Sequence, residues 1–440
     1  MSSLNFKEEI MIFHKTKYLL LINFLMLSLF SCSTIHIHNA EQVNIPDDFL
    51  GFVHAGRSFS SEEYQLLNTL GTSWILETFY WSRIEKEQGV FDFSWYDNYV
   101  NFAKANGIKV IAVMAYDTSW IKAKDEKYRY ISPDNYIHFL NFLETAVNHF
   151  KGRVDVWQVW NEPNWIFWNG TDKEFYELSR LSAKRIRETD PNAYIIGGGY
   201  SRVPVAFIKG MNRAGAMEHL DAISFHPYAT TPKAAMQLHD SLIKTLKEIN
   251  FTGDVWITEM GYPTDGWYPH KAPLDKLPSY VVKTIVGAAI RNPKVLMWYE
   301  LSDAYNYGEA PNNHDSEMFF GLTYPDRSRK KGSYAFELCA RYLSGSKYLP
   351  ALPIRDNIPS NIVSFCFTKA SSKNNTLILW NDRNSAQKIK ISLSSSFTVH
   401  DISTGNSILM PDESILDVTN TPVFITWQGE NNVRLTRAVK

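Results

Sequence analysis

Hydrophobic positions from residue 48 onward alternate between short apolar runs and longer amphipathic stretches. The short runs predict strands, and the longer stretches, with apolar positions three and four residues apart, predict helices. The predicted strands cover residues 51–54, 73–78, 109–116, 154–160, 194–198, 222–226, 254–259 and 294–300. The predicted helices include residues 61–70, 95–106, 134–151, 172–190, 234–249, 279–291 and 331–343. Eight strands that alternate with helices are typical of an α/β fold, the (β/α)8 TIM barrel.

The pattern changes after a connector that contains three prolines. Apolar positions then recur at period two, separated by turn-forming residues, over residues 362–368, 376–380, 388–393, 397–401 and 423–427. We therefore expect a catalytic barrel over residues 48–345 and a small β-sandwich over residues 346–440. The short connector favours a packing partner of the barrel over a carbohydrate-binding module, for which only Trp380 and Trp427 would be available to stack on sugars.

The first residues of the chain resemble a targeting segment. An uncharged run over residues 18–30 follows a basic lead, and it is shorter than the about 20 residues of a membrane-spanning helix. Residues 29–32, Leu-Phe-Ser-Cys, resemble the lipobox of bacterial lipoproteins. We expect a signal peptide over residues 1–32, a lipid anchor on Cys32, a tether over residues 33–47 and a location in the bacterial cell envelope. Ordinary secretion with an incidental cysteine is the alternative.

Composition and charge exclude several classes of protein. Lys and Arg number 45 against 46 Asp and Glu, so no basic excess indicates a nucleic-acid partner. Three cysteines in 440 residues exclude a disulfide scaffold, and Cys339 and Cys366 are expected to be buried free thiols. Neither metal-ligand spacing nor a glycine-rich phosphate loop is present, so no metal or cofactor is expected. The aromatic content of 14% suits a core and also sugar stacking.

Two glutamates stand at the ends of predicted strands on opposite sides of the barrel. Glu162 follows the fourth strand, and Glu259 ends the seventh. In such barrels, functional groups lie at the C-terminal ends of strands. Two facing carboxylates are what glycoside hydrolysis needs, because one group must protonate the leaving oxygen and the other must stay ionised to attack the anomeric carbon.

The sequence around these glutamates resembles clan A of the glycoside hydrolases, closest to family 39 and its endo-acting relatives. The resemblance rests on Asn161-Glu162-Pro163 after an apolar strand and on Glu259 at the end of strand seven, with support from residues 81–92 and 225–228. It implies a retaining enzyme in which Glu162 is the acid/base and Glu259 is the nucleophile. It also implies carboxyl groups about 5–5.5 Å apart.

The resemblance implies supporting roles for other residues. Asn161 would donate to the sugar 2-hydroxyl, Tyr228 would hydrogen-bond Glu259, and His226 would line the site. Trp298, at the end of strand eight, would lie beneath the sugar that is cleaved. Four further tryptophans fall in loops on the site side with polar neighbours, and we expect them to stack on substrate. These are Trp120, Trp165, Trp168 and Trp267.

The chain departs from the clan pattern on strand two. Many clan members carry an arginine there that contacts the nucleophile, whereas residues 74–79 read Trp-Ile-Leu-Glu-Thr-Phe. Lys122, Arg202 and His54 are possible substitutes. Glu77, on the same strand, is a further carboxylate near the expected mouth and ranks below the pair as a catalytic residue.

The sequence thus predicts a retaining glycosidase that is anchored as a lipoprotein and cleaves β-linked polysaccharide or oligosaccharide. We expect it to cut at internal bonds, because surface anchoring suits attack on a polymer outside the cell. One alternative is an exo-acting, xylosidase-like β-glycosidase on the same scaffold. A second alternative is a non-catalytic glycan-binding surface lipoprotein, which the missing strand-two arginine favours. Sugar identity and linkage are left open.

Overall fold

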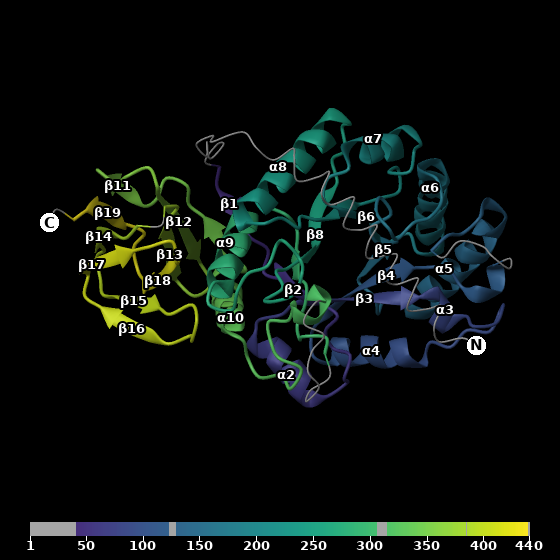
Figure 1. Ribbon diagram of the computed structural model, residues 1–440, viewed down its shortest axis with the longest axis horizontal. Coiled ribbons are helices and arrows are strands. Elements are labelled where there is room, and N and C mark those ends of the chain that lie inside the picture. Colours follow the sequence, from purple (N-terminus) through teal and green to yellow (C-terminus); the bar gives the residue numbers. More distant parts are fainter. Residues whose placement is uncertain (1–40, 123–128, 306–314, 384, 439–440) are drawn as a thin grey trace. The chain divides into compact units, whose positions relative to one another are not determined.

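The computed structural model describes residues 41–122, 129–305, 315–383 and 385–438, and residues 41–440 form one compact unit. Eight strands close into a barrel in chain order, each parallel to its neighbours, and the last pairs with the first (Figure 1). The strands are β2 (Leu50–Val53), β3 (Trp74–Tyr80), β4 (Lys109–Ala115), β5 (Val156–Val159), β6 (Tyr194–Ser201), β7 (Ala222–His226), β8 (Asp254–Met260) and β9 (Leu296–Trp298). The predicted TIM barrel is confirmed.

Helices cover the outside of this barrel (Figure 1). They are α2 (Ser61–Thr69), α3 (Trp81–Ile84), α4 (Ser94–Ala105), α5 (Tyr136–Phe150), α6 (Asp172–Thr189), α7 (Val205–Arg213), α8 (Pro232–Glu248), α9 (Leu277–Ala289) and α10 (Lys331–Leu343). Short 3-10 turns lie at η2 (Ser119–Ile121), η3 (Pro133–Asn135) and η4 (Ser316–Phe319). The sequence pattern did not indicate α7, whose Gly210 packs directly on Tyr176 where a larger side chain would clash.

Two sheets, in which most neighbouring strands are antiparallel, form the expected C-terminal sandwich. The larger sheet has the order β1 (Val43–Asn44), β10 (Lys347–Tyr348), β12 (Ile362–Lys369), β13 (Asn374–Asn381), β18 (Val423–Gln428), β15 (Phe397–His400) and β16 (Ser407–Met410). The smaller sheet has the order β11 (Ile354–Asp356), β19 (Arg434–Arg437), β14 (Gln387–Ser392) and β17 (Glu413–Val418). Strand β1 lies in the stretch that was expected to be tether, and its two residues pair with β10 across the sheet.

The sandwich packs on the barrel through apolar side chains. Phe365, Trp380 and Phe424 belong to the same buried cluster as the barrel core. Lys283 of α9 donates to the side chain of Asn420 at 2.9 Å. Trp380 and Trp427 are both buried, so neither offers an exposed ring to a sugar. This burial agrees with a packing partner of the barrel and argues against a carbohydrate-binding module.

Two of the cysteines lie within the described residues, whereas most of the N-terminal segment does not. Cys339 and Cys366 are buried and free, as expected. The expected signal peptide, Cys32 and the first part of the tether lie outside the described residues. None of the helices in the described part of the chain is both long and apolar enough to cross a membrane.

Candidate active site

Glu162 and Glu259 meet at the end of the barrel where the strands terminate. Glu259 is the penultimate residue of β8, and Glu162 lies on the segment that follows β5. The backbone of this segment is left-handed at Trp160 (φ 67°) and Glu162 (φ 43°). The amide of Glu162 donates to the carbonyl of Gly199 at 2.9 Å, which ties the segment to β6. Such left-handed positions are costly for residues other than glycine and are concentrated at functional sites.

The two carboxylates are close and share one imidazole. One oxygen of Glu162 and one of Glu259 lie within 4.8 Å of each other. His226, at the end of β7, is fully buried, and its Nδ1 lies 2.8 Å from Glu162 Oε1 and 3.4 Å from Glu259 Oε2. Its Nε2 lies 3.2 Å from the hydroxyl of Thr258, which fixes the plane of the ring. His226 is therefore placed to hold both carboxylates in position.

Tyr228 provides a second contact to Glu259. Its hydroxyl donates to Glu259 Oε2 at 3.4 Å, as the resemblance implied. Burial and the nearby charge of Glu259 raise the pKa of Tyr228 well above its usual value, so the phenol stays protonated and remains a donor. A phenolic donor stabilises the ionised form of the carboxylate that it contacts.

The electrostatics of the pair follow from burial and mutual repulsion. Burial raises the pKa of Glu259 to about 7, the attraction of His226 opposes this, and the charge of Glu162 adds to it. Burial lowers the pKa of His226, but the two carboxylates outweigh burial and raise it. Glu259 and His226 are therefore coupled, so the protonation of each depends on that of the other.

The same three residues also form a group that could hold a metal ion. Glu162, His226 and Glu259 each offer one ligand atom. However, the 2.8 Å between His226 Nδ1 and Glu162 Oε1 is a hydrogen-bond distance. Two ligands of one tetrahedral zinc ion, each about 2.0–2.2 Å from it, would lie about 3.3–3.6 Å apart. The arrangement therefore fits a hydrogen-bonded carboxylate pair better than a metal centre.

Asn161 lies beside the pair and is half-buried. Its side chain hydrogen-bonds that of Tyr116, which follows β4 and is largely buried. This bond orients the amide at the barrel mouth. The expected contact with a sugar 2-hydroxyl stays a prediction.

The expected role of Trp298 is not supported. Its side chain is 0% exposed within the barrel core, and it lies near the ring of Tyr262. Because alternate residues of a strand face opposite sides, the next residue, Tyr299, is the one that reaches the mouth. Its hydroxyl donates to Glu317 at 3.3 Å, and its ring contacts His54 edge-on. Sequence reasoning therefore placed the strand-eight aromatic one residue too early.

The four loop tryptophans differ in their exposure. Trp165 is 52% exposed, whereas Trp168 is 5% exposed and donates from its indole nitrogen to the carbonyl of Thr171. Trp120 is half-buried, and its indole nitrogen donates to the carbonyl of Glu85 at 2.9 Å. Trp267 is half-buried beside Tyr268. Trp165 thus presents an open ring, and Trp168 is a packing residue because its faces are covered.

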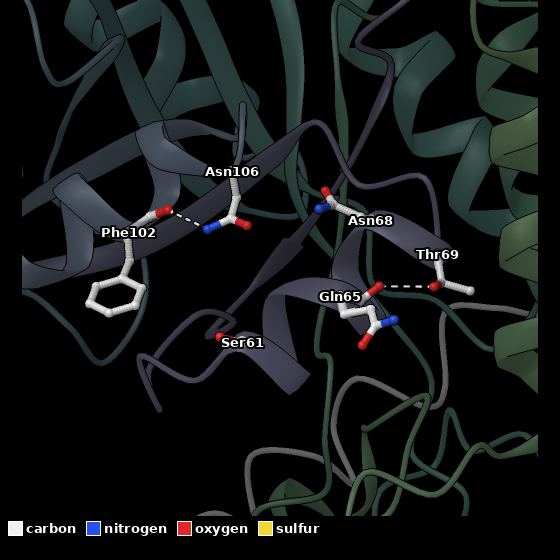
Figure 2. Close-up of a pocket in the computed structure, with 6 residues that line it drawn as sticks. All are labelled: Ser61, Gln65, Asn68, Thr69, Phe102 and Asn106. Atoms are coloured by element: carbon white, nitrogen blue, oxygen red, sulfur yellow. Dashed lines mark hydrogen bonds between the residues drawn. The ribbon is translucent and has the colours of Figure 1, made fainter.

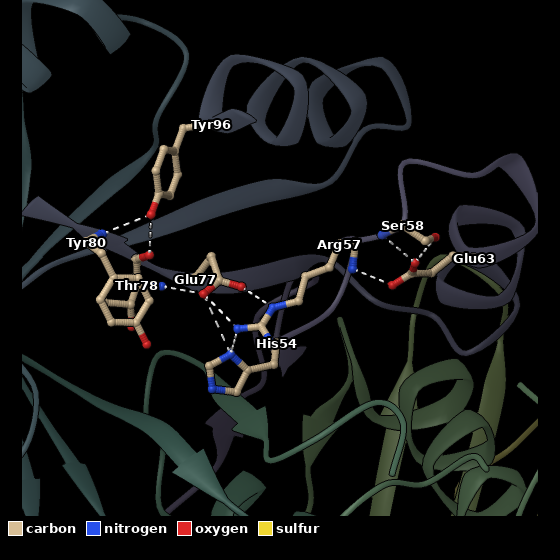
Figure 3. Close-up of polar contacts among 9 residues, drawn as sticks. His54, Arg57, Ser58, Glu63, Glu77, Thr78, Tyr80 and Tyr96 are labelled. Carbon is tan, nitrogen blue, oxygen red and sulfur yellow. Dashed lines mark hydrogen bonds and ion pairs between the residues drawn. The ribbon is translucent and has the colours of Figure 1, made fainter. Parts of the chain in front are cut away.

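An ion pair between a buried glutamate and a partly exposed arginine occupies the strand-two position that lacks the clan arginine (Figure 3). Arg57, from the loop after β2, donates to both carboxylate oxygens of Glu77 on β3, through Nε and, at 2.8 Å, through Nη2. The same Nη2 contacts the Nδ1 of His54. Burial raises the pKa of Glu77, but His54 and Arg57 outweigh it and hold it at about 2. Glu77 is thus a permanently ionised partner of Arg57 and not a catalytic acid.

This arrangement settles which groups support Glu259. Of the proposed substitutes, His54 serves Glu77, and Lys122 pairs with Asp117 at 2.7 Å. The contacts to Glu259 come instead from His226 and Tyr228. Sequence reasoning missed Arg57 because nothing in its local pattern indicates that it folds back onto β3.

Glu300 is a further carboxylate that sequence reasoning missed. It follows β9 and is buried, and its Oε1 has no hydrogen-bond partner among the described residues. Burial raises its pKa to about 8, although Arg57 opposes the shift. Its position at the end of the eighth predicted strand was the available signal, because the other two strand-end glutamates were identified in that way.

A separate hollow lies between α2 and α4, on the helical outside of the barrel (Figure 2). Its volume is about 460 Å3, and its lining consists of uncharged residues. Helix-internal bonds hold this lining: Asn106 donates to the carbonyl of Phe102, and Thr69 to that of Gln65. Because none of the described residues that line it is titratable, these residues do not offer the chemistry of the carboxylate pair.

Sequence comparisons match parts of the chain. A family model described as beta-galactosidase, of glycoside hydrolase family 42, matches residues 52–121, a stretch that contains neither glutamate. Endo-1,4-beta-xylanase A of Phanerodontia chrysosporium is 31% identical over 127 residues, which are 26% of this chain and 30% of the relative. The chain therefore matches less than a third of the length of this curated relative.

Structural comparisons match most of the chain. A family 39 glycoside hydrolase from the gut symbiont Bacteroides cellulosilyticus WH2 superposes with a TM-score of 0.71 at 19% identity, over 87% of this chain and 81% of that chain. A family 39 β-xylosidase from Caulobacter crescentus superposes with a TM-score of 0.65 at 15% identity, over 89% and 98%. The chain has the fold of these enzymes, and the resemblance to clan A glycoside hydrolases near family 39 is confirmed.

Proposed function

We propose that this protein is a retaining glycoside hydrolase that cleaves β-linked glycans at internal bonds. The observation that carries the proposal is the approach of Glu162 and Glu259 to within 4.8 Å at the ends of two barrel strands. Retaining enzymes keep their carboxyl groups about 5–5.5 Å apart, whereas inverting enzymes need about 6.5–9.5 Å to admit a water molecule. This short separation supports direct attack by one carboxylate.

The reaction would proceed in two displacements. Glu259 attacks the anomeric carbon while the bond to the leaving oxygen breaks, and Glu162 gives its proton to that oxygen. The products of this step are a glycosyl ester on Glu259 and a free sugar hydroxyl. Glu162, now ionised, takes a proton from water, whose oxygen attacks the anomeric carbon and releases Glu259. Two inversions at one carbon retain its configuration.

The neighbours of the pair suit these proton movements. The first step needs a proton on Glu162 and an ionised Glu259. Tyr228 and His226 favour the ionised form of Glu259, and His226 Nδ1 lies within 3.4 Å of both carboxylates. Both contacts therefore suit the role of Glu259 as the nucleophile.

Xylan is the first glycan to test. The curated relative is an endo-1,4-beta-xylanase and one structural neighbour is a β-xylosidase, while the matched family model is described as beta-galactosidase. The mature chain, residues 33–440, would be assayed on xylan, β-glucan, mannan and β-galactan, with NMR spectroscopy to follow the anomer first released. We expect mixed oligosaccharides with the β configuration.

Two matched variants test the roles of the carboxylates. Glu259→Gln removes the nucleophile and should abolish turnover of every substrate. Glu162→Gln removes the acid and should spare aryl glycosides, whose leaving groups need no proton, far more than polymeric glycans. An active Glu259→Gln variant, or an inverted product, would refute the assignment.

The product pattern separates the alternatives. Monosaccharide as the sole product would indicate an exo-acting β-glycosidase. Tight binding of a glycan without turnover would indicate a binding protein, for which the absence of an arginine on strand two is the observation in favour.

We also propose that Cys32 carries a lipid anchor that places the enzyme in the bacterial cell envelope. The support is the lipobox-like sequence after an uncharged run. Labelling with a palmitate analogue in a bacterial host, with Cys32→Ser as control, tests this. Equal labelling of the two chains, or none, would contradict it.

A further inference from the structure

A second hollow begins at Pro163, the residue that follows Glu162. Its volume is about 410 Å3. One wall comes from the segment that follows Glu162 and the other from the segment that follows β6. The lining residues are Pro163, Asn164, Trp165, Trp168, Gly170, Asp172, Pro204, Val205, Ala206 and Phe207. We call this hollow the Trp165 groove.

Hydrogen bonds fix the two walls of the Trp165 groove to each other. Asn164 donates from its amide to the carbonyl of Ser201 at 2.9 Å and accepts from the amide of Ser201 at 3.0 Å. The backbone amide of Trp165 donates to the carbonyl of Glu162 at 3.0 Å. Trp165 is therefore held at a set position relative to the acid/base glutamate, although its ring is exposed.

Hydrogen bonds also hold the far end of the Trp165 groove in place. Thr171 caps helix α6 by a reciprocal pair of bonds with Glu174. The indole nitrogen of Trp168 donates to the carbonyl of Thr171, so the buried Trp168 forms a firm back wall. Asp172, the first residue of α6, presents an exposed carboxylate at the rim.

The chemistry of the lining fits a neutral sugar. Trp165 and Val205 offer exposed apolar surface, on which the C–H face of a pyranose can lie. Asp172 can accept hydrogen bonds from hydroxyl groups, and the described residues of the lining include neither lysine nor arginine. A flat apolar face with a hydroxyl acceptor at its edge is complementary to a pyranose ring and has no feature that selects an anion.

The place of the Trp165 groove along the substrate follows from the chemistry. Glu162 protonates the oxygen that leaves, so the leaving sugar must lie on the Glu162 side of the bond that is cleaved. The Trp165 groove begins at the residue after Glu162, whereas Glu259 stands across the mouth on β8. A glycan whose scissile oxygen contacts Glu162 would extend its leaving portion toward Trp165.

We propose that the Trp165 groove is the binding site for the leaving portion of the glycan, with Trp165 as its stacking platform. This inference rests on the function proposed above. It assigns Trp165 as a residue that determines specificity.

The test compares two substrates that differ in their leaving group. The leaving group of xylopentaose is a sugar, which would occupy the groove. The leaving group of 4-nitrophenyl β-xylobioside is nitrophenolate, which needs no stacking there. Trp165→Ala should lower kcat/KM for xylopentaose by about tenfold or more, because a central tryptophan contact contributes at least that much. It should change kcat/KM for the aryl glycoside by less than about twofold. Trp165→Phe, which keeps a ring, should restore most of the loss.

Each outcome bears on the assignment. An equal fall for both substrates would show that Trp165 acts through the fold or the carboxylates, and an unchanged rate on xylopentaose would show that the groove does not bind the leaving sugar. Either result would overturn the inference and leave the proposed function intact. If the unaltered chain turns over neither substrate, the same comparison is made with the oligosaccharide and the 4-nitrophenyl glycoside of the glycan that it does cleave.

Discussion

His226 offers the sharpest test of the proposed catalytic pair. Its Nδ1 lies 3.4 Å from Glu259 Oε2 and 2.8 Å from Glu162 Oε1, and the carboxylates raise its pKa. The imidazolium therefore stabilises the ionised form of Glu259, whose pKa is about 7 because burial opposes ionisation. We consider the substitution His226→Asn, which removes this positive charge and leaves a polar side chain.

The size of the effect follows from Coulomb's law. Two unit charges about 4 Å apart interact by about 4 kcal/mol at an effective dielectric constant of about 20. At 1.36 kcal/mol per pKa unit, this corresponds to about 3 units as an upper bound. Because the imidazolium is shared between two carboxylates, and water can enter the space that the ring leaves, we expect about 1–2 units. The change is upward, because loss of a cation destabilises the carboxylate.

The assay is the pH dependence of kcat/KM on 4-nitrophenyl β-xylobioside. This leaving group needs no proton, so the acidic limb of the profile reports ionisation of Glu259. In the unaltered enzyme the acidic limb should have its midpoint near pH 7. In His226→Asn this midpoint should move up by about 1–2 pH units. Thr258→Val, which removes only the Nε2 contact, should move it by less than about half a unit. A limb that stays in place or moves down in His226→Asn would refute the reasoning.

Three further changes have expected outcomes. Replacing Glu317, whose charge raises the pKa of Glu259, by glutamine should move the same limb to lower pH, and an upward shift would contradict the assigned repulsion. Arg57→Met leaves Glu77, 2% exposed, without its guanidinium and should lower the free energy of unfolding by about 1–2 kcal/mol at pH 7, less than for a fully buried pair because the Arg57 side chain is 44% exposed and His54 remains. Because Glu77 has a pKa of about 2 against its usual 4.5, this loss should shrink in urea melts as the pH falls from about 4.5 toward 2, and a loss independent of pH would count against the ion pair. Trp380→Ala should lower the free energy of unfolding by about 3–5 kcal/mol, because Trp380 is buried in the barrel–sandwich core, while kcat/KM at a temperature well below unfolding should be unchanged.

The periodicity of the chain was enough to predict the barrel and its two glutamates. Residues 222–226 were predicted as a strand with the bounds that β7 has. Parallel strands of a barrel end at one face, so Glu162 and Glu259 could be brought together without knowledge of the contacts between them. The short strand β1 and helix α7 were not apparent, because two strand residues or a glycine-containing helix leave little periodic signal.

The sequence by itself determined the helices and strands, their order and the strand ends that carry the candidate catalytic residues. These features depend on residue spacing along one strand or helix. The tertiary structure alone decided which side chains meet. It placed His226 between glutamates 64 and 33 positions away, Arg57 on Glu77 in place of a strand-two arginine, and Tyr299 instead of Trp298 at the mouth. Such contacts join groups on different strands, and their distances follow from the closure of the barrel and the turn of each loop, which no local pattern encodes.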